Sequence, residues 1–370
     1  MNLRRWQWMA ARLDWAAFFA ILLLLAAGIA FIYSAGYRGE DHPPAEFYRK
    51  QLGWCALGLT IFLTAAAGDY RRLGPQAAWL YVVALGLLGA VLLFGLKVYG
   101  ARRWLVLFGQ RVQPSEFAKL ATILALARYL AAPATDPRAN STLAVAGLLV
   151  AAPFLLIALE PDLGTALTLL PVAATLLVVA GAPWRKLGVL ALCGLLLLPA
   201  GWFLLGEYQR NRLLVFIEPG RDPLGAGWNS IQSGIAVGSG GFWGKGYLQG
   251  TQNVLGFLPR TVAPTDFIFS VIAEEKGFVG SVALLALYAI VTAGGIRAAH
   301  RAPDPFGRLL AAGLTALLYF HVFTNIAMTI GLLPVTGLPL PLVSYGGSFL
   351  AAALLALGWI QSVFIRRVEP

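Results

Sequence analysis

Charged residues are scarce in this sequence: they make up 12% of its 370 positions, while hydrophobic residues make up 59%. Soluble domains carry about 25% charged residues, so this chain has too few polar side chains to cover a water-facing surface. The shortage excludes a soluble globular protein and a disordered one. Apolar runs of about 20 residues recur along the chain, and each is long enough to cross a bilayer as a helix.

Cysteine and histidine are scarce as well. The two cysteines, Cys55 and Cys193, lie inside apolar runs and are interpreted as packing residues, which excludes a disulfide scaffold. The three histidines are scattered, and none has neighbours spaced to bind a transition metal. The net charge of +11 is spread between the apolar runs, so nucleic acid is not an expected partner.

The apolar runs predict an all-α fold: a polytopic membrane bundle of about ten transmembrane helices, forming one domain over residues 1–370. The predicted spans are 14–35, 50–68, 76–96, 114–133, 142–159, 162–182, 187–206, 266–296, 307–332 and 342–365. Lys and Arg are more frequent in the connections on the side of the N-terminus, which predicts that both termini are cytoplasmic. Residues 207–265 form the one long connection, which then faces outward, and its aromatic residues favour an ordered structure.

One outer connection departs from the expected charge bias. The cations of this segment, which contains no acidic residue, are Lys97, Arg102, Arg103 and Arg111. Arginine binds phosphate well through its fork of donors. The segment is therefore an anion site at the outer leaflet, a contact for lipid headgroups, or a chance departure from the bias.

Two predicted spans carry charges, which are costly in a bilayer and usually functional. Glu116 and Lys119 share one helix face, either as a reactive pair or as a neutral structural pair. Asp266, Ser270 and Glu274 follow at i, i+4 and i+8 along one face of a later span. Asp266 begins that span, where it is either the N-cap of the helix or a reactive carboxylate.

Two further motifs have simpler interpretations. Glu160 and Asp162 flank a proline at a span boundary, a pattern that favours a helix cap. The glycine-rich stretch 238–246 is not a P-loop, because Ser239 stands where that motif needs glycine and Gly246 where it needs Ser or Thr. Its backbone amides could instead form an anion-binding nest.

Several short motifs follow one another along the chain. They are GARRW at 100–104, QPSEFAK at 113–119, EPDLGT at 160–165, GWNSIQS at 227–233, the glycine-rich stretch, GTQ at 250–252, TDFIFS at 265–270, AEE at 273–275 and PLPLVSYGGS at 339–348. In this order they resemble the SEDS family of bacterial shape, elongation, division and sporulation proteins. The resemblance extends from about residue 14 to 365, and the GTQ motif is RodA-like.

The resemblance implies an enzyme, a peptidoglycan glycosyltransferase that polymerises lipid II into β-1,4 glycan strands for cell elongation and shape. It implies synthesis at the outer face of the bacterial cytoplasmic membrane, with a class B penicillin-binding protein as the transpeptidase partner. The essential aspartate of the family maps to Asp266, and its Glu and Lys map to Glu116 and Lys119.

Inverting glycosyl transfer needs a base and groups that stabilise the leaving pyrophosphate. We expect Asp266 to be the general base, with Glu116 orienting Lys119 or assisting Asp266. The cations expected near the pyrophosphate are Lys119, Arg102, Arg103, Arg210 and Arg212. Further substrate contacts are predicted for Gln232, Ser233, Lys245, Glu274 and Ser344. The sequence does not require a metal, although Mg²⁺ or Mn²⁺ bridging a carboxylate and the pyrophosphate is compatible with the chemistry.

The sequence departs from the family pattern at one point, and two alternative functions are open. The family commonly has three residues, often Glu-x-His, between its Phe-Leu-Pro and Thr-Asp motifs, whereas this chain has five, at 260–264, and no histidine. The first rival is a lipid II flippase, which would need charges along its whole path and not mainly at the outer ends of the spans. The second is a scaffold, which would not explain charges such as Glu116 and Lys119 inside apolar spans.

Overall fold

The structure is a helical bundle, as predicted. The computed structural model describes residues 3–37, 46–98, 101–107, 109–222 and 225–367; Gly100, which begins the GARRW motif, lies outside them. A helix occupies each predicted span, and the helix ends differ from the predicted ends by a few residues. These helices are α2 (Trp15–Gly36), α3 (Phe47–Ala67), α4 (Leu73–Phe94), α5 (Pro114–Leu130), α6 (Asn140–Leu159), α7 (Leu163–Ala180), α8 (Trp184–Leu204), α12 (Ile268–His300), α13 (Pro305–Thr329) and α14 (Gly347–Ile365). Nine helices in the described part of the chain are long and apolar enough to cross a membrane.

The exception is α5, which lies inside the bundle. Its 17 residues span about 26 Å, less than the hydrocarbon core of about 30 Å. The helix contacts α4, α6, α7, α13 and α14, and nearly all of its side chains are buried. Glu116 and Lys119 therefore face protein and not lipid, so a helix that carries charges is tolerated at this position.

Helix α12 is interrupted at Gly277, whose φ of 65° lies in the left-handed region. A side chain on this residue would collide with the backbone nitrogen of Gly244, so only glycine fits where the two backbones cross. The segment 241–246 pairs with α12 next to this point, where Lys245 N donates to Glu274 O at 3.0 Å.

The glycine-rich stretch 238–246 is therefore a packing element. Three of its amides donate to backbone carbonyls, two of which belong to α12; the donors are Gly244, Lys245 and Gly246. Because these three amides already have acceptors, they are not available to the anion nest that the sequence suggested. The close approach of the two backbones is what requires the glycines.

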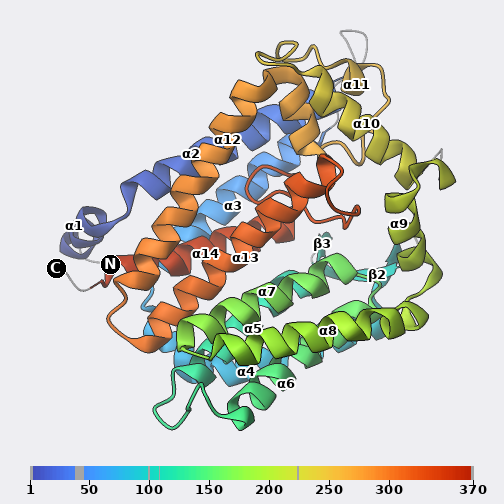
Figure 1. Ribbon diagram of the computed structural model, residues 1–370. Coiled ribbons are helices and arrows are strands. Elements are labelled where there is room, and N and C mark those ends of the chain that lie inside the picture. The colour runs from blue at the N-terminus through green and yellow to red at the C-terminus, as the bar shows by residue number, and fades with distance from the viewer. Residues whose placement is uncertain (1–2, 38–45, 99–100, 108, 223–224, 368–370) are drawn as a thin grey trace.

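The described residues of the segment 207–265 fold into short helices at one end of the bundle (Figure 1). The helices are α9 (Glu207–Ile217), η2 (Pro219–Arg221), α10 (Ala226–Ser239) and α11 (Thr251–Val254). The same end carries an antiparallel sheet that the sequence analysis did not predict, with strands in the order β1 (Leu96–Val98), β2 (Ala101–Leu107) and β3 (Gln110–Val112).

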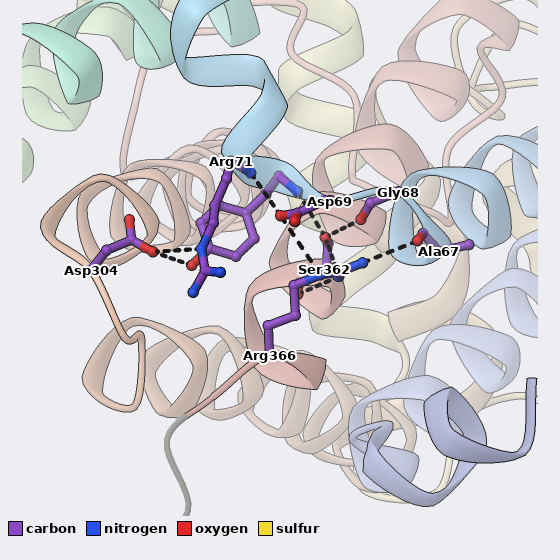
Figure 2. Close-up of polar contacts among 8 residues, drawn as sticks. Ala67, Gly68, Asp69, Arg71, Asp304, Ser362 and Arg366 are labelled. Atoms are coloured by element: carbon purple, nitrogen blue, oxygen red, sulfur yellow. Dashed lines mark hydrogen bonds and ion pairs between the residues drawn. The ribbon is translucent and has the colours of Figure 1, made fainter. Parts of the chain in front are cut away.

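Both ends of the described chain lie at the opposite end of the bundle, together with α1 (Leu3–Arg12) (Figure 1). Polar contacts fasten the helices there (Figure 2). Arg366 Nε lies 3.6 Å from Asp69 Oδ1, and Arg71 Nε lies 3.4 Å from Asp304 Oδ2. These pairs tie the turn between α3 and α4 to the end of α14 and the start of α13.

Candidate active site

Asp266 lies, half-buried, in the turn that precedes α12. The backbone of this turn is held from two sides: Asn325 Nδ2 donates to Asp266 O at 3.0 Å, and Ser344 Oγ donates to Thr265 O at 2.5 Å. Phe267 is the N-cap residue of α12, and no side chain caps that helix end. The N-cap alternative for Asp266 is therefore wrong, and its carboxylate is available for other contacts.

Arg212, from α9, lies beside the Asp266 carboxylate at Gly337. A methyl group on Gly337 would lie 3.6 Å from Asp266 Oδ2 and 3.7 Å from Arg212 Nη1. Arg212 Nη1 donates to Thr336 O at 3.0 Å, which fixes the guanidinium in place. Burial raises the pKa of Asp266 to about 6, and the positive charge of Arg212 limits the rise.

Arg103, from β2, binds the turn between α6 and α7. Its Nε donates to Glu160 O at 3.2 Å, and its Nη1 lies 3.9 Å from Asp162 Oδ1. Asp162 caps α7, as predicted, by accepting a bond of 3.4 Å from Thr165 N. The charges of Arg103 and Asp162 also act on Asp266. The α6–α7 turn and the turn before α12 therefore meet in one site.

Glu160 adds a third carboxyl group to this site. The residue is fully buried, and neither carboxyl oxygen has a hydrogen-bond partner among the described residues. Burial raises the pKa of Glu160 to about 8, the charge of Asp162 adds to the rise, and Arg103 opposes it. Glu160 is therefore mostly protonated at neutral pH and can donate a hydrogen bond. From the sequence, Glu160 is expected only in a helix cap, because the local motif carries no sign of burial.

Glu116 and Lys119 form the predicted pair, with 2.9 Å between Oε2 and Nζ. Lys119 Nζ also lies 2.8 Å from His321 Nε2 and 5.9 Å from the centre of the Phe349 ring. The described contacts of this ammonium group thus join α5 to α13 and α14. His321 was not singled out from the sequence, where it stands alone in an apolar span.

Arg102 and Arg210 bind the ends of helices. Arg102 Nη1 donates to the carbonyls of Leu92 and Leu93, both at 3.2 Å. Arg210 donates in the same way from Nε to Trp202 O, at 2.9 Å. Each guanidinium thus satisfies carbonyls of the last turn of a helix, α4 or α8, that have no partner within the helix.

Lys245 and Glu274 bind each other, with 2.6 Å between Nζ and Oε1. The same carboxylate oxygen accepts from Thr251 Oγ1 at 2.9 Å and from Gln252 N at 3.1 Å. These bonds hold the segment that follows the glycine-rich stretch against the first half of α12.

The predicted serines bind the backbone around the site. Ser233 Oγ donates to Thr329 O at 2.7 Å and lies 2.6 Å from Ser270 Oγ. Ser344 Oγ, besides its bond to the turn before α12, accepts from Leu340 N at 2.8 Å. Gln232 is buried beside Ser233 on α10. The structure thus brings these residues to the same end of the bundle as Asp266.

The carboxylates of the site do not fit a resident metal ion. No group of three His, Cys, Asp or Glu side chains within the described residues is arranged to hold one. Asp266 and Asp162 each lie near an arginine instead.

Comparisons with known proteins agree with this architecture. The family profile described as cell cycle protein, FtsW/RodA/SpoVE, matches residues 14–368. The chain is 42% identical to the peptidoglycan glycosyltransferase MrdB of Escherichia coli K12, over 97% of this chain and 95% of that one. It is 34% identical to the peptidoglycan glycosyltransferase RodA of Treponema pallidum, over 96% and 98%.

Solved structures share the fold as well. A structure of a peptidoglycan synthase complex, concerned with how polymerization and crosslinking are coordinated, matches with a TM-score of 0.80 at 35% identity, covering 97% of this chain and 99% of the other. The crystal structure of the rod shape determining protein RodA of Thermus thermophilus matches with a TM-score of 0.71 at 33% identity, over 97% and 98%. The matched profile and these relatives extend over nearly the whole chain, which therefore belongs to the FtsW/RodA/SpoVE family.

Proposed function

We propose that this chain is a peptidoglycan glycosyltransferase that polymerises lipid II into β-1,4 glycan strands. Relatives that align with nearly all of the chain carry that enzyme name. The observation that carries the mechanism is the Asp266 carboxylate, which lies beside Arg212 and has a pKa of about 6. At that pKa most of the carboxylate is ionised at neutral pH and can still accept a proton efficiently.

Asp266 is the general base in this mechanism. It takes the proton from the 4-hydroxyl of the acceptor sugar while the hydroxyl oxygen forms a bond to C1 of the donor sugar. The bond between C1 and the pyrophosphate oxygen breaks, and the electron pair leaves with the pyrophosphate. One displacement inverts the α-linked donor to a β-linked product without a covalent intermediate.

Arg103 and Arg212 stabilise the pyrophosphate as its negative charge increases. Both guanidinium groups are already fixed by backbone carbonyls, so little reorganisation is needed when the charge develops. Arg102 and Arg210 stabilise the helix ends that carry neighbouring parts of the site.

The remaining predicted residues hold the helices and turns around the site in place. Glu116 orients Lys119, and their contact with His321 fixes α5 against α13. Lys245 and Glu274 hold the glycine-rich stretch on α12. The bonds of the predicted serines to the backbone, described above, keep the turns near Asp266 in place.

In a cell the site faces outward, because it lies at the end of the bundle opposite to the termini (Figure 1) and the bias of Lys and Arg assigns the termini to the cytoplasm. A class B penicillin-binding protein crosslinks the product and so supports elongation. A related synthase complex that joins polymerization to crosslinking supports this pairing.

The decisive experiment is lipid II polymerisation by the purified protein, with and without the partner transpeptidase, with labelled glycan chains resolved on a gel. We expect Asp266→Asn to lower the rate at least 100-fold, the usual contribution of a general base. Asp136→Asn is the matched control, because Asp136 is an exposed aspartate in the connection between α5 and α6, and it should polymerise normally.

Equal activity of Asp266→Asn and wild type would remove Asp266 as the base and leave Glu116 or Glu274 as candidates. If neither protein makes polymer but the wild type moves lipid II across vesicles, the function is that of a flippase.

A further inference from the structure

Helix α8 stands apart from the rest of the bundle. No described side chain in its apolar stretch Trp184–Phe203 is buried, although this stretch is long enough to span a membrane. Between α8 and α6 lies an open groove of about 560 Å³, within the range of about 300–1,000 Å³ that is usual for ligand sites. The apolar residues that line it are Leu143, Ala144, Gly147, Val189 and Leu190.

One end of this groove is positively charged. Arg185 and Lys186 line it at the start of α8, together with Asn140 at the start of α6. Lys186 Nζ donates to Asn140 Oδ1 and to Arg138 O, both at 2.5 Å. The nearby acid, Asp136, accepts from Arg138 N at 2.9 Å, so one of its carboxylate oxygens is held within its own turn. Arg185 is exposed to a ligand in the groove.

The groove is separate from the candidate active site. Its charged end lies at the start of α6, whereas Glu160 and Asp162 follow the end of the same helix. The 20 residues of α6 separate the two ends by about 30 Å, the thickness of a bilayer core. A ligand in the groove therefore contacts the opposite leaflet from the sugar chemistry.

We propose that this groove binds an anionic phospholipid, with an acyl chain between α6 and α8 and the headgroup phosphate against Arg185 and Lys186. The apolar walls match a hydrocarbon chain, and the two cations match a phosphate that has no balancing positive charge. A zwitterionic lipid would supply the chain without the net charge, and a transmembrane polypeptide would leave the two cations without a phosphate. The bound lipid gives α8 the packing partner that the described protein side chains do not provide.

The test is native mass spectrometry of delipidated full-length protein in detergent, titrated with dioleoyl-phosphatidylglycerol or dioleoyl-phosphatidylcholine. We expect the wild type to retain phosphatidylglycerol preferentially. Arg185→Gln should weaken that binding about fivefold, the usual effect of one cation at a membrane surface. A Cβ on Gly147 meets no atom within 4 Å, so the side chain of Gly147→Leu would occupy the groove without disturbing the bundle and should weaken binding about tenfold.

Two variants are matched controls. Arg301→Gln removes an exposed arginine from the connection between α12 and α13, outside the groove. Gly86→Leu adds a leucine to an open position on α4. Both should bind phosphatidylglycerol as the wild type does.

Three results would overturn the proposal: equal binding of both lipids by the wild type, unchanged phosphatidylglycerol binding by Gly147→Leu, or equal loss of binding in the controls. A thermal unfolding scan with inorganic phosphate alone tests whether the groove binds a free phosphate ion and not a lipid headgroup. Stabilisation by phosphate equal to that by phosphatidylglycerol would identify a free anion and not a lipid. If Gly147→Leu does not fold, the comparison of Arg185→Gln with Arg301→Gln decides the question.

Discussion

Asp266 experiences two opposing influences on its proton affinity. Burial favours the neutral acid and raises its pKa to about 6, while the charge of Arg212 favours the carboxylate. A general base works in its ionised form. The polymerisation rate should therefore be maximal above pH 6, be half-maximal near pH 6, and fall about tenfold for each further unit of acidification.

Arg212→Gln tests which group determines the fall in rate at low pH, the acid limb of the pH profile. Loss of the arginine removes the influence that lowers the Asp266 pKa, so the limb should move to higher pH while the maximum rate also falls. The measurement is the pH profile of polymer formation for both proteins. Arg221→Gln, on the neighbouring turn η2, is the control and should keep the wild-type profile. An unchanged limb in Arg212→Gln would mean that another group controls it.

Single charged residues could be singled out from the sequence, but their partners could not. Asp266, Glu116 and Lys119 stand out because a charge in an apolar span is unusual and the family motifs contain them. The site partners of Asp266 come from α9 and Gly337, and no local pattern relates these distant segments. Arg102 and Arg103 are adjacent in the sequence, yet only Arg103 reaches the α6–α7 turn. The difference depends on the alternation of side chains along β2, a strand that the sequence analysis did not predict.

At the scale of elements, the kink in α12 depends on one residue. Gly277 adopts a positive φ and touches the backbone of the glycine-rich stretch. Gly277→Ala should destabilise the protein by at least about 2 kcal/mol, because a left-handed residue with a side chain costs about 1–2 kcal/mol and the collision with Gly244 adds to it. Thermal unfolding in detergent measures the change.

Gly89→Ala is the matched control for this substitution. Gly89 lies inside α4, and a Cβ there meets no atom within 4 Å. Alanine is the better helix former, so the control should be neutral or more stable by up to about 1 kcal/mol. Equal stability of the two variants would contradict the role of Gly277.

The number and order of the helices could be predicted because apolar length is a property of each segment alone. The helices within 207–265 could not, since their apolar faces pack against other parts of the same chain and leave no run of spanning length. Packing against protein also determines the composition of the short helix α5. This helix is enclosed by other helices, so its residues need not be suited to contact with lipid.

At the scale of the whole molecule, the positions of the termini and of residues 207–265 predict how the chain is oriented in the membrane. Residues 207–265 and the termini lie at opposite ends of the bundle (Figure 1). In a variant without its two native cysteines, Arg221→Cys should react with a membrane-impermeant thiol reagent on spheroplasts, which expose the outer face of the cytoplasmic membrane. Arg301→Cys should react only after the membrane is opened. Both positions are exposed, so the reversed pattern would show that the termini face outward.

The crossing at Gly277 also constrains the order of biogenesis. The glycine-rich stretch leaves the ribosome before α12 does, so in the proposed topology it is translocated before the helix half that it must bind has been inserted. Its donors Lys245 and Gly246 find their carbonyl acceptors, on Glu274 and Glu275, only after α12 has been inserted. In the proposed topology, the exported segment lacks its docking surface until then and is open to proteases of the cell envelope.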